Sequence, residues 1–303
     1  MRESEVLQPL SAYFGHHRCG STWIHAILEG ICANAGWRLS YLPDEEGLGP
    51  FDGDLSLAID RRRVEFLSFV NANIELVGRL KSFRGFHVVR DPRDMLVSAY
   101  YSHLHSHSTA YWPELVDHRK ELQRLSKKEG LLSEMEFSRK FYGHMMAWDY
   151  NQDNVLELRL EDISADPYGH FLRIFDFLGI LGEEPFSKKR QLTLWLRSSI
   201  NLLWRFRVIP LRARTRTMPA ERLLGIVHHH RFARMAHGRQ RGQEDIKSHY
   251  RKGVSGDWVN HFNDDHVARF KESYGDLLLK LGYEAAPDWS LSDPLDRQAA
   301  PYR

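Results

Sequence analysis

The sequence feature that most constrains the fold is an apolar run, Leu10 to Gly15, which meets a helical pattern after only a few residues. The run has the length of a buried strand, and the turn that follows it ends in Gly20. Apolar residues then recur at helical spacing, at Trp23, Ile24, Ala26, Ile27 and Ile31. A strand that passes through a tight turn into a helix is the opening unit of a mostly parallel α/β sheet.

The same alternation of strand and helix continues along the chain. Strands are predicted at Glu65 to Asn71, Gly85 to Val89 and Val155 to Leu160, which are rich in apolar residues. Helices are predicted to open at Asp91-Pro92 and Asp166-Pro167, where Asp is a favoured N-cap and Pro a favoured first residue. We therefore expect an α/β, P-loop-like three-layer fold with a central parallel β-sheet flanked by helices, forming one domain over the whole chain.

Cysteine usage and hydropathy suggest a compartment. Only two cysteines, Cys19 and Cys32, occur among 303 residues, which gives no disulfide framework and suits a reducing environment. No apolar stretch has the length that a membrane-spanning helix needs, and the charged N-terminus has no signal-peptide core. We expect a cytoplasmic protein.

The first turn can bind an anion. A strand that ends in a tight turn and opens a helix leaves backbone N–H groups pointing at one spot, and the helix dipole adds positive potential there. Gly20 allows close approach of the backbone, Ser21 and Thr22 add hydroxyl donors, and Arg18 adds a permanent cation. The loop lacks the G-x-x-x-x-G-K-[ST] spacing of a nucleoside-triphosphate loop, so by itself it is weak evidence for a ligand.

Two further segments can bind phosphate. Arg90 follows a predicted strand at the edge where open α/β sheets hold ligands, and Ser98 lies two turns into the next helix. Arg251-Lys252-Gly253 is a basic loop that can wrap a phosphate with both side chains and backbone. Ion pairing or an exposed basic turn would explain each segment taken alone. Two anion sites with an aromatic residue, Trp23, beside one of them suit a nucleotide that carries phosphates at both ends of its ribose.

Taken together, these segments resemble the cytosolic-type sulfotransferases. Cys19-Gly20-Ser21-Thr22-Trp23 resembles their 5′-phosphosulfate loop, and the stretch from Phe86-His87-Val88-Val89-Arg90 to Ser98-Ala99-Tyr100-Tyr101 resembles their 3′-phosphate segment. Arg251-Lys252-Gly253-x-x-Gly256-Asp257-Trp258 is similar to their C-terminal signature. The segments occur in the order that the family has, and the resemblance spans about residues 10–285.

The resemblance implies transfer of a sulfuryl group from 3′-phosphoadenosine 5′-phosphosulfate (PAPS) to a hydroxyl or amine, releasing PAP and requiring no metal. The acceptor would be a small molecule, a glycan or a lipid. The cofactor-binding residues implied are Arg18, Cys19, Gly20, Ser21, Thr22 and Trp23 around the 5′-phosphate and adenine, and Arg90, Ser98, Arg251, Lys252 and Gly253 around the 3′-phosphate. Arg18 stands where the family usually has a lysine, so its catalytic role would be electrostatic and not that of a proton donor.

The family's usual general base is missing. It is a histidine in a Lys-x-His pattern after the second strand, and the stretch 66–73 has asparagines and no histidine. The candidates that remain open are His17 beside the first loop and the carboxylates Asp44, Glu45 and Glu46. Histidine has a suitable pKa, whereas a carboxylate would need its pKa raised by burial.

Two other functions remain open. A nucleotide-dependent kinase could use the same fold, although the incomplete triphosphate loop and the second phosphate site argue against it. A PAP-binding protein without catalytic activity would account for the missing histidine and for the arginine in place of lysine. The dimer signature that often follows Gly-Asp-Trp in the family is also missing, which leaves the oligomeric state open.

Positive charge is concentrated in one segment, although the net charge is only +2. Residues 188–241 contain fourteen Lys and Arg residues and one acidic residue, Glu221. Because Trp195, Trp204 and Phe206 lie among them, we expect the segment 191–242 to include amphipathic helix that covers the acceptor site. Peripheral membrane contact is the alternative, since basic and aromatic residues together suit a lipid surface. Binding of nucleic acid is not expected, because no second feature supports it.

Two groups of histidines have weaker interpretations. His228-His229-His230 could bind a metal, but no carboxylate or cysteine cluster accompanies them, so an exposed basic turn is favoured. His103, His105 and His107 alternate within a polar stretch, 103–130, that is expected to be a loop with helical pieces over the site. These histidines could line the mouth of the acceptor site, but loop residues without a ligand are favoured.

Overall fold

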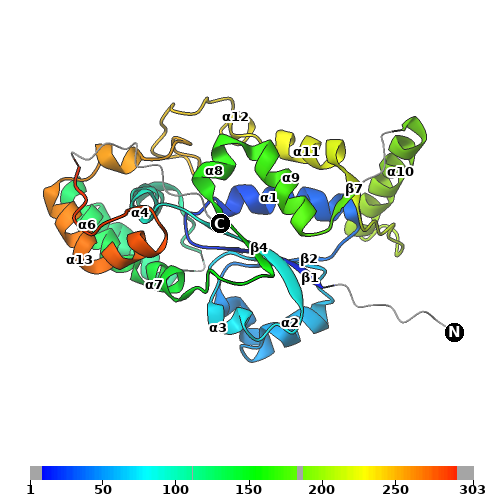
Figure 1. Ribbon diagram of the computed structural model, residues 1–303, viewed down its shortest axis with the longest axis horizontal. Helices are drawn as coiled ribbons and strands as arrows, with labels where there is room; N and C mark the ends of the chain where they lie inside the picture. Colours follow the sequence, from blue (N-terminus) through cyan, green and yellow to red (C-terminus); the bar gives the residue numbers. More distant parts are fainter. Residues whose placement is uncertain (1–8, 111, 183–186, 292–303) are drawn as a thin grey trace.

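The computed structural model describes residues 9–110, 112–182 and 187–291. Its centre is a five-stranded sheet in the order β2-β3-β1-β4-β5, in which every neighbouring pair is parallel (Figure 1). The strands are β1 (Leu10–Gly15), β2 (Leu39–Leu42), β3 (Phe66–Phe69), β4 (Phe83–Val89) and β5 (Val155–Arg159). The predicted α/β fold with a central parallel sheet is confirmed.

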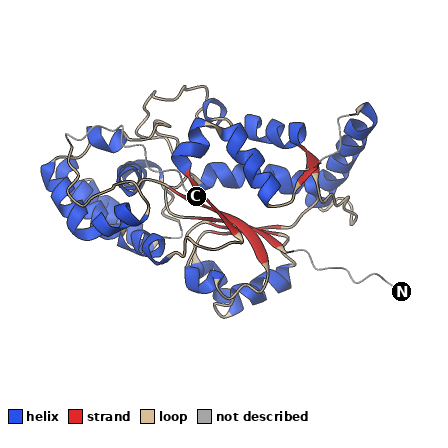
Figure 2. Cartoon of the chain, in the orientation of Figure 1, coloured by secondary structure: helices blue, strands red, loops and turns tan. Residues whose placement is uncertain are grey.

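Helices cover both faces of this sheet (Figures 1 and 2). One face is covered by α1 (Ser21–Ala35), α8 (Leu160–Ala165), α9 (Pro167–Phe177) and α11 (Ala220–His229). The other face is covered by α2 (Leu55–Arg62) and α3 (Ile74–Val77). Successive side chains of β1 point to opposite faces of the sheet. Tyr13 packs with α1 on one face, and Phe14 packs with α2 and α3 on the other. Burial of both faces explains why the inner strands β3, β1 and β4 are mostly apolar instead of strictly alternating.

A third group of helices packs beside the sheet around its own buried cluster. Its members are α4 (Pro92–Tyr101), α6 (Lys127–Phe137), α7 (Arg139–Ala147) and α13 (Asp264–Lys280), with α5 (Pro113–Leu122) against α6. The stretch 103–130, predicted to be a loop with helical pieces, contains such pieces, and they make up more than half of it. A π-helical turn, η2 (Ser102–Ser106), extends α4, and α5 buries Leu115 and Leu122 on one side.

The basic segment forms two longer helices and a short one. These are α10 (Lys188–Arg205), α11 and α12 (Phe232–Met235). The remaining elements are η1 (Glu45–Phe51), η3 (Asp257–Asn260) and a two-stranded pair, β6 (Leu181–Gly182) with β7 (Met218–Pro219). Helix α10 packs against α1 at one end of the molecule (Figure 1). Within the described residues, none of these helices is long and apolar enough to cross a membrane.

The strand order determines where a ligand can bind. From β1 the chain continues to β2 and β3 on one side, and it then crosses to β4 and β5 on the other. The loops that leave the carboxyl ends of β1 and β4 therefore diverge and open a crevice between two adjacent strands. The first phosphate loop and Arg90 lie at these two strand ends.

Candidate active site

A cavity of about 540 Å³ occupies this crevice. Three predicted segments line it: the loop after β1, the start of α4 and the loop 249–255. The predicted residues that it brings together are His17, Arg18, Gly20, Ser21, Thr22, Trp23, Asp44, Glu46, Arg90, Ser98, Arg251, Lys252 and Gly253. Segments separated by more than two hundred residues therefore share one cavity.

The N-terminus of α1 faces this cavity without a side-chain cap. Its N-cap residue, Gly20, has a left-handed backbone with φ 78°, and a Cβ there would lie 2.6 Å from Cδ1 of Leu160. Both the backbone and the space therefore require glycine. Because no side chain accepts a hydrogen bond from the first turn, its N–H groups are available to an anion. Ser21 is fixed by Tyr13, whose hydroxyl donates to the Ser21 Oγ over 3.2 Å.

Arg18 joins the two predicted phosphate sites. Its Nε donates to the Ser98 Oγ over 3.0 Å, and its other nitrogens contact His249, with one donating to the carbonyl oxygen over 3.3 Å. Burial and the neighbouring guanidinium groups of Arg90 and Arg251 lower the pKa of Arg18 to about 10. Cations crowded in this way are stabilised when an anion enters between them, which favours a ligand with several negative charges.

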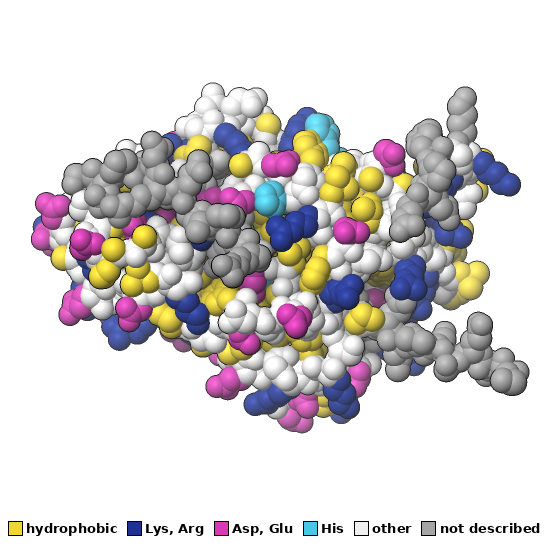
Figure 3. Space-filling model, viewed as in Figure 1, with side chains coloured by type: hydrophobic (Ala, Val, Ile, Leu, Met, Phe, Trp, Pro, Cys, Tyr) yellow, Lys and Arg dark blue, Asp and Glu magenta, His cyan; other side chains and the backbone are white. Residues whose placement is uncertain are grey.

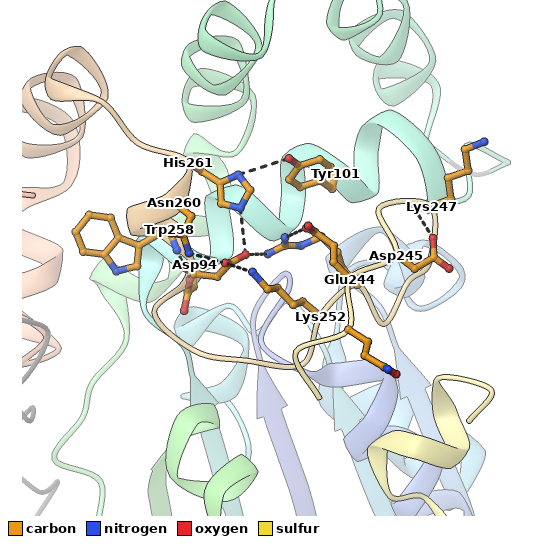
Figure 4. A network of polar contacts seen from close by, with 12 residues as sticks. Asp94, Tyr101, Glu244, Asp245, Lys247, Lys252, Trp258, Asn260 and His261 are labelled. Carbon is orange, nitrogen blue, oxygen red and sulfur yellow. Dashed lines mark hydrogen bonds and ion pairs between the residues drawn. The ribbon is translucent and has the colours of Figure 1, made fainter. Parts of the chain in front are cut away.

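The third segment is held by a network of polar contacts around Asp257 (Figure 4). Arg251 and Lys252 donate to the two Asp257 oxygens over 2.5 and 2.6 Å, and Arg251 also pairs with Glu244. Although burial acts to raise it, hydrogen bonds from Lys252 and Arg251 hold the pKa of Asp257 well below its usual range. Asp257 thus remains an anion that fixes both cations in place.

Helix α4 anchors the same loop through its first turn. The backbone N–H groups of Gly256 and Trp258 donate to the Asp94 carboxylate over 2.6 and 3.0 Å. Gly253, with φ 69°, lies under the ring of Phe232, where a Cβ would come within 2.4 Å of ring carbon. The basic loop is therefore rigidly placed against α4.

Two of the predicted residues do not line the cavity. The Cys19 side chain is fully buried against Met95, with 3.5 Å between the two sulfur atoms, and its N–H donates to the His16 carbonyl oxygen. Glu45 accepts hydrogen bonds from Asn73 and pairs with Lys140, and these contacts lower its pKa. A carboxylate base would need the opposite shift, so Glu45 is poorly placed and poorly tuned for that role.

His17 lies at the end of a buried chain of titratable groups. Its Nε2 is 3.0 Å from the Nε2 of His103, and the Nδ1 of His103 is 2.9 Å from a Glu134 oxygen. His118 contacts the same carboxylate over 2.9 Å, and the Ser138 hydroxyl donates to it over 2.6 Å. Burial acts against the charge of Glu134, but His103 and His118 lower its pKa to about 2.

The imidazole of His17 is neutral in this setting. Burial, together with His103 and Arg18, holds the pKa of His17 well below its ordinary value. Its ring stacks on Phe141 with 4.3 Å between ring centres, which fixes its orientation. A neutral, oriented histidine at the wall of a cationic cavity can accept a proton, and the lowered pKa makes it a weaker base than an exposed imidazole.

Several lining residues were not predicted from the sequence. His249 contacts Arg18, and His107, from the polar stretch, lines the same wall. Burial lowers the pKa of His249 to about 3 and that of His107 to about 4. An aromatic and apolar wall completes the cavity, formed by Trp112, Phe141, Phe232, Met235 and Val70. No motif marks these residues, because they come from separate loops and helices.

Other predicted features lie outside the cavity. Most of the segment 191–242 lies away from the cavity: among its described residues only Phe232, Met235 and Arg241 line it, and no described residue of α10 does. The histidines 228–230 end α11, where the Tyr168 hydroxyl and the His228 Nδ1 are 2.7 Å apart.

Two groups of described residues could hold a metal ion: His103 with His118 and Glu134, and Glu244 with Asp257 and His261. In both groups the carboxylates already pair with neighbouring side chains.

Comparisons with known proteins identify the family and the fold. A sequence model described as the sulfotransferase domain matches residues 79–282. Among solved structures, a mouse sulfotransferase complexed with PAP matches with a TM-score of 0.53 and 18% identity, covering 89% of this chain and 84% of that one. Retinol dehydratase in complex with androsterone and inactive PAP matches with a TM-score of 0.52 and 18% identity, covering 89% and 82%. No curated protein matches the chain in sequence.

Proposed function

This chain belongs to the sulfotransferase family, and on that premise we propose that it transfers the sulfuryl group of PAPS to an acceptor hydroxyl or amine. One observation carries the proposal: the uncapped start of α1 and the cluster Arg90, Ser98, Arg251 and Lys252 face the same cavity. This arrangement offers one anion site for a 5′-phosphosulfate and another for a 3′-phosphate.

The residues present fit this nucleotide. Gly20 leaves room beside Leu160 for a close approach of phosphate to the backbone, and Arg18 lacks a carboxylate partner among its described hydrogen bonds. When bound, PAPS supplies the sulfuryl group, whose bond to the 5′-phosphate oxygen breaks as the acceptor oxygen bonds to sulfur. Trp23 lines the cavity with its Nε1 donating to the His230 carbonyl over 2.8 Å, which leaves a ring face for adenine.

Fixed positive charge is the main catalytic contribution we assign to the first loop. Arg18 and the N–H groups of α1 stabilise the charge that develops on the departing phosphate. Ser98 and His249 already hold the Arg18 side chain, and the N–H groups are fixed in the helix. Both therefore need little reorganisation during the reaction. Arg18 keeps its proton at neutral pH, so the leaving phosphate departs as an anion.

His17 is the general base that we propose. The ionised Glu134 can only accept hydrogen bonds, so the His103 Nδ1 donates to it. The His103 Nε2 then accepts from the His17 Nε2, and the His17 Nδ1 is left with a lone pair. When the acceptor hydroxyl attacks, its proton passes to the His17 Nδ1, and His103 with Glu134 stabilises the resulting charge. His103 and Glu134 are positioning residues, while His17 contacts the acceptor.

The aromatic wall supports a small-molecule acceptor with an apolar body. Phe141, Trp112 and Phe232 flank the cationic part of the cavity, so a flat or ring-bearing alcohol could pack there with its hydroxyl toward His17. The resemblance to cytosolic-type sulfotransferases supports a cytoplasmic location. The lining residues of the phosphate part supply cations, and the proposed reaction assigns no step to a metal.

Calorimetric titration with PAP, ADP and 5′-AMP tests the cofactor assignment. We expect micromolar binding of PAP and at least tenfold weaker binding of ADP and 5′-AMP, because only PAP places a phosphate on Arg90, Arg251 and Lys252. Equal binding of all three ligands, or a preference for ADP, would contradict the 3′-phosphate site and favour a kinase. The formation of sulfated product from labelled PAPS and a panel of phenols and sterol alcohols separates an enzyme from a PAP-binding protein.

The pH dependence of kcat/KM for PAPS should show an unusual acid limb. A base works only when it is unprotonated, and an ordinary histidine loses that form below a pH of about 6.5. Because burial and nearby cations depress the pKa of His17, it stays neutral to lower pH, and activity should persist well below that value. Two results together would argue against His17 as the base: a wild-type kcat/KM that halves near pH 6.5, and a His17→Asn variant whose pH profile keeps the same slope.

A further inference from the structure

Helix α10 turns its apolar side away from the protein. Its most exposed large apolar residues lie along one stripe that is interrupted at Ser199: Leu192, Trp195, Leu196, Leu202, Leu203 and Phe206. Trp195 is 61% exposed and Phe206 is 72% exposed. The stripe continues beyond the helix end with Val208 and Leu211, which are equally exposed. We call these eight residues the α10 patch.

The opposite side of α10, which faces the protein, is held by polar contacts. Asn201 is buried and donates to the carbonyl oxygens of Asn34 and Ala213 over 2.9 and 3.1 Å. The Ser198 hydroxyl donates to the Asn34 side chain over 2.8 Å. A surface helix normally buries most of its apolar side chains. Helix α10 half-buries Leu194 and Trp204 on this side but leaves the six residues of its outer stripe exposed. An exposed apolar surface of this kind marks an interaction site.

The charge around the patch indicates what it binds. Residues 188–216, which contain α10 and the patch, have nine Lys and Arg residues and no acidic residue, and Figure 3 shows Lys and Arg side chains among hydrophobic ones at the α10 end of the molecule. Three of them pair with glutamates elsewhere in the chain: Arg205 with Glu29, and Arg212 and Arg214 with Glu65. Lys189 and Arg207 lie at the two ends of the patch, are exposed and form no ion pair within the described part of the chain. From this combination we infer that the α10 patch docks onto an anionic lipid bilayer surface, with Trp195 and Phe206 inserted at the interface.

A bilayer fits this surface better than a second copy of the chain. In a twofold dimer the same patch would meet itself, so the basic residues of both copies would gather at one interface and repel. An anionic membrane instead neutralises Lys189 and Arg207 while it covers the apolar stripe. Helix α10, which carries the patch, contacts Asn34 through Asn201 on its other side, and Asn34 lies about 20 Å along α1 from the phosphate loop. None of its residues lines the cavity, so docking leaves the active site free.

Vesicle binding of the whole protein tests the inference. We expect sedimentation with phosphatidylcholine vesicles that contain phosphatidylglycerol, little sedimentation with phosphatidylcholine alone, and loss of binding at high salt. Brominated lipids should quench tryptophan emission in the wild type, and the quenching should fall in Trp195→Phe. The double variant Trp195→Ser/Phe206→Ser should lower the partition constant at least about tenfold, and Arg207→Gln about fivefold.

Matched controls separate docking from misfolding and from the proposed function. Val116→Ser changes an exposed apolar residue on α5, outside the patch and the cavity, and should leave vesicle binding unchanged. The double variant should keep the thermal midpoint and the PAP affinity of the wild type, because its two side chains contact neither core nor cavity. Vesicle binding equal in the double variant and the wild type would overturn the inference. So would a lack of binding to anionic vesicles at low salt, or concentration-dependent dimerisation that buries Trp195 without lipid.

Discussion

Replacing His17 by asparagine is expected to lower kcat about a thousandfold while leaving the affinity for PAP nearly unchanged. Asparagine cannot take the acceptor proton, and the His17 ring makes no described hydrogen bond to Arg90, Arg251 and Lys252, the residues proposed to bind the 3′-phosphate. Product formation from labelled PAPS at saturating acceptor gives kcat, and calorimetry on the same preparation gives the PAP dissociation constant. A loss confined to kcat identifies a role in the chemical step.

The residues behind His17 give a graded series. His103→Asn and Glu134→Gln should lower kcat about ten- to a hundredfold, because His17 keeps its position in the wall but loses the group that shares its charge. Glu134→Gln also removes a buried charge from between two histidines, so its thermal midpoint must be compared with that of His103→Asn. His105→Asn, an exposed neighbour on η2, is the matched control and should change nothing.

Three outcomes of this series would contradict the proposed roles of His17, His103 and Glu134. The first is a His17→Asn enzyme with wild-type kcat, and the second is an equal loss of PAP affinity and of kcat. The third is a loss of activity after chelation, since His103, His118 and Glu134 could instead hold a metal ion. We expect that a chelator leaves the activity unchanged and that kcat falls only in the His17, His103 and Glu134 variants.

The framework of this fold is predictable because its signals are local. The Asp91 side chain accepts from the Arg93 N–H and the Asp166 side chain from the Gly169 N–H, so both helix starts follow from a single capping residue. The four predicted strands are present because each is a compact apolar run between turns. Strand β2 was missed, since Leu39–Leu42 is a short edge strand with alternating polarity.

The three motifs that meet in the cavity were predictable from the sequence, and the chain of side chains behind His17 was not. Arg18, Arg90 and Arg251 each belong to a motif in which neighbouring residues add information. His118 lies in α5 within the polar stretch and Glu134 lies in α6 just after it, and only the packing of α5 against α6 brings the two together behind His17. A long-range contact of this kind leaves no pattern in one sequence, and that is also why His249 was missed.

Helix α10 shows a different limit of sequence patterns. Its apolar spacing predicts an amphipathic helix, but periodicity does not say which side faces the protein. The side of α10 that packs against the protein is set by hydrogen bonds to Asn34. Ser198 donates to the Asn34 side-chain amide oxygen, and Asn201 donates to the Asn34 backbone carbonyl oxygen. The prediction that this part of the chain covers the acceptor site rests on the assumption that an apolar stripe turns inward, and for α10 the stripe turns outward.

Arg251→Ala is expected to weaken PAP binding about a hundredfold, or about 2.7 kcal/mol, and 5′-AMP binding less than about threefold. Arg251 is buried in the cavity wall with its guanidinium over the Tyr101 ring, so its loss leaves the 3′-phosphate without its fork of donors. Asp257 keeps Lys252, Asn260 and His261 as partners, which should preserve the loop. Calorimetry with both nucleotides measures the difference directly.

A matched variant on the other side of this ion pair makes the test sharper. Glu244 is the second carboxylate that pairs with Arg251, and a bound 3′-phosphate must compete with it for the same guanidinium. Glu244→Gln weakens that competitor without touching Arg251, so PAP should bind as tightly as to the wild type or more tightly. If Arg251→Ala loses PAP and 5′-AMP equally, the arginine acts through the fold and not on the 3′-phosphate. If Glu244→Gln weakens PAP as much as Arg251→Ala does, the two residues act together as a structural pair, and the phosphate assignment must move to Arg90 and Lys252.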